Sequence, residues 1–424
     1  MSLARVKMVC LVFAAALALS GMGALASAAP VADSAILLIG DGMGPVQIEL
    51  AREAAGGAPL AMERMPFSGI MTTHAADRAV TDSAAAGTAL ATGRKTNNGM
   101  IGVSPAGERL ETILERCRKA HKSTGIITTD ALHGATPASF AAHAESRGMR
   151  SEIAEQLAAS GVQVMLGFWR GWFLPESAGG SREDDQDLLA GMRRSGYGVV
   201  FTKDELAGAK EQRLVGLFDD GEQAPKLAEM VTAALDRLSV NADGFFLAVE
   251  GARIDWKCHG SDPAGSVLDT WEFDEAIAAA LDRAQRRGRT LVVVTADHET
   301  GGLSIDKPRL TSSLGAVTLC SEALAAKLNS DRTNVAEVLA AHAGLSDVTP
   351  AELEEVKQAE ESAAAIAALL SKRAGVSWGT TGHTATRLRV FAYGPGAERF
   401  TGEMDNTDIS KRIGEVLGLG SFPP

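Results

Sequence analysis

The sequence predicts an α/β fold with a mainly parallel central sheet and helices on both faces. Short apolar runs typical of buried strands alternate with helical runs through most of the chain. An acidic residue ends or closely follows three of these apolar runs, at Asp41, Glu250 and Asp297. Because parallel strands share one carboxyl edge, where α/β folds build their sites, we expect these acids to lie together.

Strand-like and helix-like runs follow one another in order. We expect strands at residues 35–40, 125–130, 162–168, 198–202, 244–251, 290–295 and 388–393. We expect helices in runs that end near 55 and 417, that begin near 83 and 135, and at 108–121, 224–238, 274–287 and 350–372. Residues 29–424 should form a single catalytic domain, in which about 303–376 is a peripheral insertion without comparable polar motifs.

Composition limits the function classes. The chain has 424 residues, of which 46% are hydrophobic and 22% charged, which is typical of a globular protein with a sizeable core. The net charge is −12 and no basic patch is evident, so we expect no nucleic-acid binding. An acidic protein that handles anionic substrates needs a local positive source, which metal ions supply.

Residues 1–28 have the pattern of a secretory signal peptide. Arg5 and Lys7 precede an apolar run at 8–19, and small residues at 24–28 offer cleavage sites. The apolar run is too short for a membrane span, and no later run is long enough. We therefore expect an exported protein, periplasmic or secreted, without a membrane span after cleavage.

A serine stands at the start of a helix of small residues. Ser83 follows Asp82 and precedes the run Ala84-Ala85-Ala86-Gly87. Backbone N–H groups at a helix N-terminus bind anions well, and small neighbours leave them accessible. An ordinary N-cap role, by Asp82 or Ser83, is the alternative that this stretch alone leaves open.

Other motifs carry residues that bind metals. The run Gly40-Asp41-Gly42-Met43-Gly44 lacks the last glycine of a dinucleotide fingerprint, and its acid suits a metal better than a pyrophosphate. Glu250 ends an apolar strand, where a carboxylate is costly unless it is paired or metal-bound. Asp255 and His259 would share one face of a helical turn. The adjacent Asp297 and His298 offer oxygen and nitrogen, a pair that suits zinc.

Five motifs occur in one order between residues 41 and 384. They are Asp41-Gly42-Met43-Gly44, Thr81-Asp82-Ser83-Ala84-Ala85-Ala86-Gly87-Thr88, Val249-Glu250-Gly251-Ala252-Arg253-Ile254-Asp255, Thr295-Ala296-Asp297-His298-Glu299-Thr300 and Gly382-His383-Thr384. Together they resemble the alkaline phosphatase family, and the resemblance spans most of the mature chain.

The resemblance implies a role for each matching residue. Ser83 would be the nucleophile and Arg147 the phosphate clamp. One zinc would be held by Asp255, His259 and His383. A second zinc would be held by Asp41, Asp297 and His298. A magnesium ion would be held by Asp41, Thr136 and Glu250.

The implied reaction is metal-dependent hydrolysis of small-molecule phosphate monoesters through a phosphoserine, which releases inorganic phosphate and an alcohol. Paired metals stabilise the attacking and leaving oxygens of such a displacement, and a serine hydroxyl without a neighbouring base needs this help. The resemblance is compatible with a homodimer. The alternatives are a phosphodiesterase of the same superfamily and a non-catalytic exported protein that binds metal or phosphate. A sulfatase is disfavoured because no Cys/Ser-x-Pro-x-Arg run occurs.

Two positions depart from the family pattern. Gly134 stands two residues before Thr136, where relatives often carry His or Asp. Trp256 follows Asp255, where other members have Lys or His. Glycine has no side chain that could contact the magnesium ion or its waters. Because such contacts outside the ligands contribute about 10–100-fold to metal affinity or activity, we expect magnesium to bind less tightly than zinc. On the sequence alone, Gly134→His should tighten the binding of magnesium.

Overall fold

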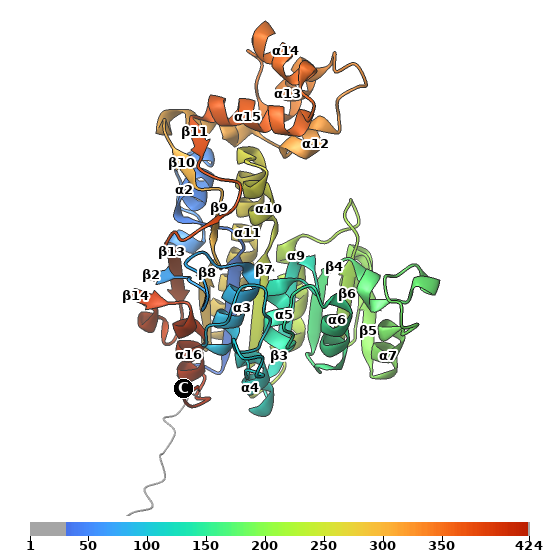
Figure 1. The fold of residues 1–424 in the computed structure, drawn as a ribbon. Helices are drawn as coiled ribbons and strands as arrows, with labels where there is room; N and C mark the ends of the chain where they lie inside the picture. The colour runs from blue at the N-terminus through green and yellow to red at the C-terminus, as the bar shows by residue number, and fades with distance from the viewer. Residues whose placement is uncertain (1–30, 423–424) are drawn as a thin grey trace, which may run out of the picture.

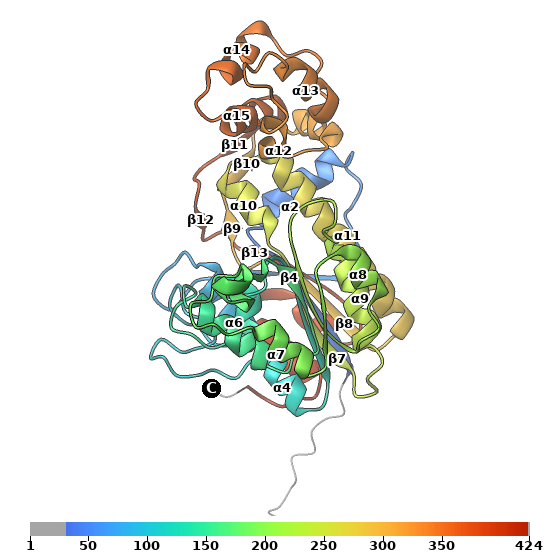
Figure 2. The same cartoon turned by 90° about the vertical axis from the view of Figure 1, so that its right-hand side faces the viewer.

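The computed structural model describes residues 31–422 (Figures 1 and 2). The expected signal peptide, residues 1–28, lies outside these residues. Within them, ten strands form one sheet in the order β14-β2-β13-β8-β1-β7-β3-β4-β6-β5. Their bounds are β1 Ser34–Gly40, β2 Phe67–Thr72, β3 Ser123–Ala131, β4 Val164–Phe168, β5 Tyr197–Val200, β6 Arg213–Phe218, β7 Phe245–Gly251, β8 Thr290–Thr295, β13 Leu388–Tyr393 and β14 Gly402–Asp405.

The sheet is parallel except at β13, which runs antiparallel to both β2 and β8. The central strands β1, β7 and β8 are buried along their whole length, because helices cover both faces. On one side lie α9 (Leu227–Leu238) and α11 (Pro263–Arg287), which pack on each other (Figure 2). The other side carries α3 (Ser83–Thr92), α4 (Ile113–Lys119), α5 (Ala135–Ala141) and α16 (Thr407–Val416). The predicted α/β fold is confirmed.

The remaining helices of the main body flank these layers. They are α2 Pro45–Ala54, α6 Arg150–Ala159, α7 Leu188–Arg194, α8 Lys203–Gly208 and α10 Arg253–His259. Short 3-10 helices lie at η1 Met62–Arg64, η2 Arg170–Phe173, η3 Glu176–Ala178 and η5 Ala397–Phe400, and a longer one, η4 Pro308–Ala316, lies between β9 (Glu299–Thr300) and β12 (His383–Thr384). No helix in residues 31–422 is both long and apolar enough to cross a membrane.

Two helix predictions need correction. The helix expected at 108–121 begins only at Ile113, because Thr112 and Glu115 form a capping box there. The sequence predicts a helix from near residue 135 that contains His143 and Arg147, whereas the observed helix ends at Ala141 and leaves both residues outside it. The chain instead turns extended, and an antiparallel bridge joins Ala144 to Ile101.

Thr136 is helical, whereas the proline that follows it predicts an extended conformation. Its place in the first turn of α5 explains the difference. A proline in the first turn costs little, because the N–H groups there have no partner within the helix.

Residues between β9 (Glu299–Thr300) and β12 (His383–Thr384) form a separate layer beside the main body (Figure 1, orange). It contains β10 Leu303–Ile305, α12 Ser321–Ala325, α13 Val335–Ala343, α14 Pro350–Gln358, α15 Ser362–Ala374 and β11 Val376–Trp378. Its apolar side chains, such as Leu339 and Ile366, cluster with Leu50 of α2 and Val267 of α11. The run expected as helix at 350–372 is divided between α14 and α15.

Candidate active site

Three acids meet at the carboxyl edge of the sheet. Strands β8, β1 and β7 are neighbours, and Ile39 of β1 pairs with both Thr295 and Glu250. Asp41 follows β1, Glu250 is the penultimate residue of β7, and Asp297 comes two residues after β8. The sheet thus places these acids at one level, as the sequence predicts.

Asp41, Asp297 and His298 form a compact buried group. The His298 Nε2 atom lies 3.2 Å from Asp297 Oδ2 and 3.5 Å from Asp41 Oδ1. The other Asp297 oxygen accepts hydrogen bonds from the backbone N–H groups of Gly42 and His298. Asp41 Oδ1 and Asp297 Oδ2 are buried without a hydrogen-bond partner. Such oxygens are costly unless a cation or proton compensates them.

The pKa values at this edge of the sheet also indicate that the buried carboxylates need a cation or a proton. Burial, followed by the charges of Asp297, Asp255 and Glu250, raises the pKa of Asp41 well above its usual value. Burial, followed by the charge of Asp130, raises the pKa of Glu250 to about 8. The carboxylates therefore repel one another, and a bound divalent cation would relieve that repulsion.

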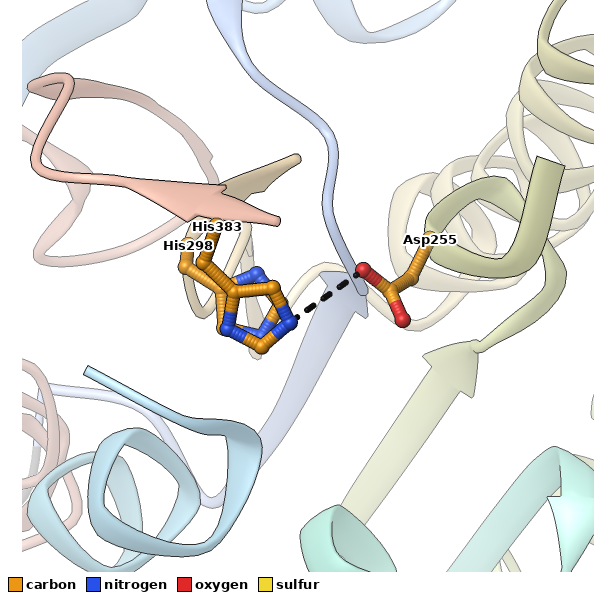
Figure 3. A group of neighbouring side chains, drawn as sticks. All are labelled: Asp255, His298 and His383. Carbon is orange, nitrogen blue, oxygen red and sulfur yellow. Dashed lines mark ion pairs between the residues drawn. The ribbon is translucent and has the colours of Figure 1, made fainter. Parts of the chain in front are cut away.

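A second group of potential ligands consists of Asp255, His298 and His383 (Figure 3). The His383 Nε2 atom lies 3.7 Å from Asp255 Oδ1. The rings of His298 and His383 stack with centroids 3.5 Å apart and planes inclined by 19°. His298 therefore belongs to both groups, so the two predicted zinc sets are contiguous in space.

His259 approaches this group from the more exposed side of α10. Its Nε2 atom lies 3.2 Å from Asp255 Oδ2, and its Nδ1 atom lies 2.5 Å from the carbonyl oxygen of Thr381. The His383 Nδ1 atom likewise lies 3.0 Å from the carbonyl oxygen of Thr81. When Nδ1–H donates a hydrogen bond to a backbone carbonyl, the Nε2 atom of the neutral imidazole carries the free lone pair that can coordinate a metal.

Asp255 and His259 perturb each other. Burial acts to raise the pKa of Asp255, but the His259 hydrogen bond and the charge of His298 outweigh it and lower that pKa to about 2. The same hydrogen bond raises the pKa of His259 to about 8. Asp255 is therefore a carboxylate over the whole physiological pH range.

Ser83 lies beside the first group. It is the first residue of α3, and Asp82 provides the cap by accepting from the backbone N–H of Ala85 at 3.0 Å. The ordinary N-cap role therefore falls to Asp82. The Ser83 Oγ atom lies 3.3 Å from His298 Nε2, although the two residues are 215 positions apart. The sequence shows no base next to Ser83, whereas the structure brings an imidazole to it.

Arg147 reaches the same helix start. Its Nη1 atom lies 3.2 Å from Asp82 Oδ2, and its side chain is 45% exposed. Asp82 Oδ1 also accepts a hydrogen bond from the backbone N–H of Gly99. Asp82 thus caps α3 and orients a guanidinium toward the end that carries Ser83. Arg147 retains N–H donors with which to bind the oxygens of an anion.

A third group surrounds Glu250. The hydroxyl of Thr128 donates to Glu250 Oε2 and accepts from the backbone N–H of Asp130. The buried Oγ1 atom of Thr136 lies close enough to Glu250 to lower its pKa, without the geometry of a full hydrogen bond. The oxygens around Glu250 form a donor set that suits magnesium.

Asp130 is the residue of this third group that our sequence reasoning missed. The available signal was its position at the end of the strand now seen as β3. A Cβ atom at Gly134 would lie 2.6 Å from Asp130 Oδ2 and 2.9 Å from the carbonyl oxygen of Ala131. No side chain fits there without displacing Asp130, so the expectation that Gly134→His tightens magnesium is corrected.

Comparison with known proteins identifies the family. The family model described as Alkaline phosphatase matches residues 32–419. The chain is 36% identical to Alkaline phosphatase 4 of Bacillus subtilis over 418 residues, which cover 91% of this chain and 88% of the relative.

Solved structures agree. The structure of Thermus thermophilus alkaline phosphatase has a TM-score of 0.83 and 29% identity, with 95% of each chain covered. A magnesium-bound mutant of the alkaline phosphatase from the Antarctic bacterium TAB5 has a TM-score of 0.69 and 27% identity, with 92% of this chain and 99% of that chain covered. On the combined match of family model, relatives and fold, the chain belongs to the alkaline phosphatase family and is a phosphatase.

Proposed function

We propose that this phosphatase hydrolyses phosphate monoesters through a covalent phosphoserine at Ser83, with the help of two zinc ions and one magnesium ion. One observation carries the proposal. The Ser83 hydroxyl, the His298 Nε2 atom and unpartnered oxygens of Asp41 and Asp297 converge at the start of α3. A nucleophile, metal donors and a helix N-terminus that attracts phosphate thus occupy one place.

The donor sets fit the proposed metals. Mixed carboxylate oxygen and imidazole nitrogen suit zinc, and buried oxygens without partners are what a cation would satisfy. Asp41, Asp297 and His298 would hold one zinc, and Asp255, His259 and His383 the other. Asp41, Thr136 and Glu250 would hold magnesium through oxygen alone. Bound zinc supplies Lewis acidity that ionises a hydroxyl or water and stabilises charge on oxygen.

The chain's own residues account for the rest of the reaction. The Ser83 hydroxyl would release its proton, and its oxygen would attack phosphorus and form a new P–O bond. The bond from phosphorus to the leaving oxygen would break, and the departing alkoxide would take up a proton to give the alcohol. Water would then cleave the bond between phosphorus and Ser83, releasing inorganic phosphate and restoring the hydroxyl. Arg147, held by Asp82, would bind the non-bridging oxygens through both attacks. A dianionic phosphate monoester has one more non-bridging oxygen than a diester, and the Arg147 guanidinium can bind it.

The substrate panel that tests this function has three members with one leaving group. They are 4-nitrophenyl phosphate, bis(4-nitrophenyl) phosphate and 4-nitrophenyl sulfate. We expect the monoester to react fastest, with activity lost on chelation and restored by zinc. Faster release from the diester would favour the phosphodiesterase alternative.

Trapping the intermediate tests the mechanism. Acid quenching with labelled phosphate should leave the label on Ser83. Ser304, an exposed serine of the peripheral layer, is the control and should carry no label. Label on another residue would contradict the phosphoserine. We also propose that the protein acts after export; mature N-terminal sequencing of protein recovered outside the cytoplasm tests this.

A further inference from the structure

Trp169 adopts a backbone conformation that is unusual for a large side chain. Its φ is 56°, in the left-handed region, and it lies between β4 and the turn η2. A bulky residue in this region is strained, and such backbone strain concentrates at functional sites. The residue is 40% exposed, and within residues 31–422 Trp169 is the one aromatic among the exposed large apolar residues. Core packing therefore does not explain this residue.

The exposed indole is held by a second one. The rings of Trp169 and Trp256 stack with centroids 5.6 Å apart and planes inclined by only 7°. Trp169 comes from the end of β4 and Trp256 from α10 after β7, and β3 lies between these strands in the sheet. The Trp169 backbone N–H also donates to the carbonyl oxygen of Phe218 at 3.0 Å. The two stacked indoles thus form an aromatic platform.

This aromatic platform lies at the edge of the candidate active site. Trp256 directly follows Asp255 on α10. The strand register pairs Phe168 with Ala131, so Trp169 lies alongside the segment that follows Asp130. Asp255 lies in one ligand group with His298, whose Nε2 atom is 3.3 Å from the Ser83 hydroxyl, so the aromatic platform adjoins the group that contains the nucleophile.

We propose that the exposed face of Trp169, backed by Trp256, binds a planar aromatic leaving group of the substrate. The preferred substrates are then aryl or nucleobase-bearing phosphate monoesters. This inference rests on the proposed function, because it places the phosphate at Ser83 and Arg147. An indole offers a flat π face that stacks on any planar ring, whatever polar groups that ring carries.

Phosphonates test the platform without turnover, because their P–C bond is not hydrolysed. Calorimetry of the metal-loaded protein compares phenylphosphonate with methylphosphonate. We expect phenylphosphonate to bind about tenfold more tightly, equivalent to about 1.4 kcal/mol. Trp169→Ala should remove this preference, and Trp169→Phe should keep most of it. Val240→Ala, at an apolar position that is 67% exposed at the opposite edge of the sheet, is the control and should keep all of it.

Kinetics give a second readout. The ratio of kcat/KM for 1-naphthyl phosphate to that for glycerol 1-phosphate should fall about tenfold in Trp169→Ala, through KM, and should not change in Val240→Ala. An unchanged ratio and unchanged phosphonate preference in Trp169→Ala would overturn the platform while leaving the phosphatase mechanism intact. A phenylphosphonate preference that depends on Trp169 in a protein that releases no phosphate would support the platform and refute the proposed function.

Discussion

Without metal, this protein should become less stable as the pH rises, and Glu250 should cause much of the loss. Burial and the charge of Asp130 raise the pKa of Glu250 from 4.5 to about 8. Between these two values the folded state keeps a proton that the unfolded chain releases. The free energy of unfolding therefore falls as the pH rises through this window. Asp41, whose pKa is also raised, acts in the same direction.

The expected size follows from the linkage. Each pH unit inside the window costs about 1.36 kcal/mol, so the full window costs up to about 5 kcal/mol. Between pH 5 and pH 7.5 the loss from Glu250 alone is about 3 kcal/mol. This is a large share of the 5–15 kcal/mol that typically stabilises a protein.

Urea unfolding of the chelated protein at pH 5 and pH 7.5 measures this loss. Glu250→Gln keeps the shape of the side chain without a titrating group. Its free energy of unfolding should therefore fall by about 3 kcal/mol less between pH 5 and pH 7.5 than that of the unchanged protein. Glu403→Gln, at an exposed position on β14, is the matched control and should behave as the unchanged protein does. Magnesium added at pH 7.5 should restore stability to the unchanged protein but less to Glu250→Gln. Equal losses in the unchanged protein and in Glu250→Gln would refute this account.

Three further predictions concern single side chains. Ser83→Ala should lower kcat by at least about a thousandfold while inorganic phosphate still binds, as product inhibition or calorimetry would show. Arg147→Ala should raise the inhibition constant of phosphate by about 10–100-fold, since each hydrogen bond to a charged group contributes about 1.5–3 kcal/mol; an unchanged constant would exclude the clamp. Gly134→His should weaken magnesium binding in equilibrium dialysis, because the new side chain displaces Asp130; tighter binding would contradict the steric argument.

The central sheet could be predicted from the sequence because its strands are covered on both faces. Continuous apolar runs at β1, β7 and β8 follow directly from that burial. Strands β2 and β14 were not predicted, since each has exposed positions that interrupt the apolar run. Strand β6 was also missed, although most of it is buried. Its six residues include a glycine, which weakens a strand pattern.

The chemistry of the site was readable from residue types, but its distances were not. Sequence gives no measure of the 3.3 Å between Ser83 and His298, because the fold alone joins residues 215 positions apart. The sharing of His298 between two ligand groups is likewise a product of the fold. Asp130 escaped notice because no motif contains it. Its effect on Glu250 depends on how closely β3 and β7 pair.

The peripheral layer carries no ligand in our assignment, yet its two ends set the geometry of the histidines. Glu299 of β9 accepts hydrogen bonds from Gln47 Nε2, at 2.9 Å, and from the hydroxyl of Thr384 on β12. Strand β9 pairs with β12, so the residue after His298 is joined to the residue after His383. The buried Glu299 carboxylate thus links the segment that leaves the main body to the segment that returns to it. This pairing brings His298 and His383 onto adjoining chain segments, where their imidazoles stack with centroids 3.5 Å apart.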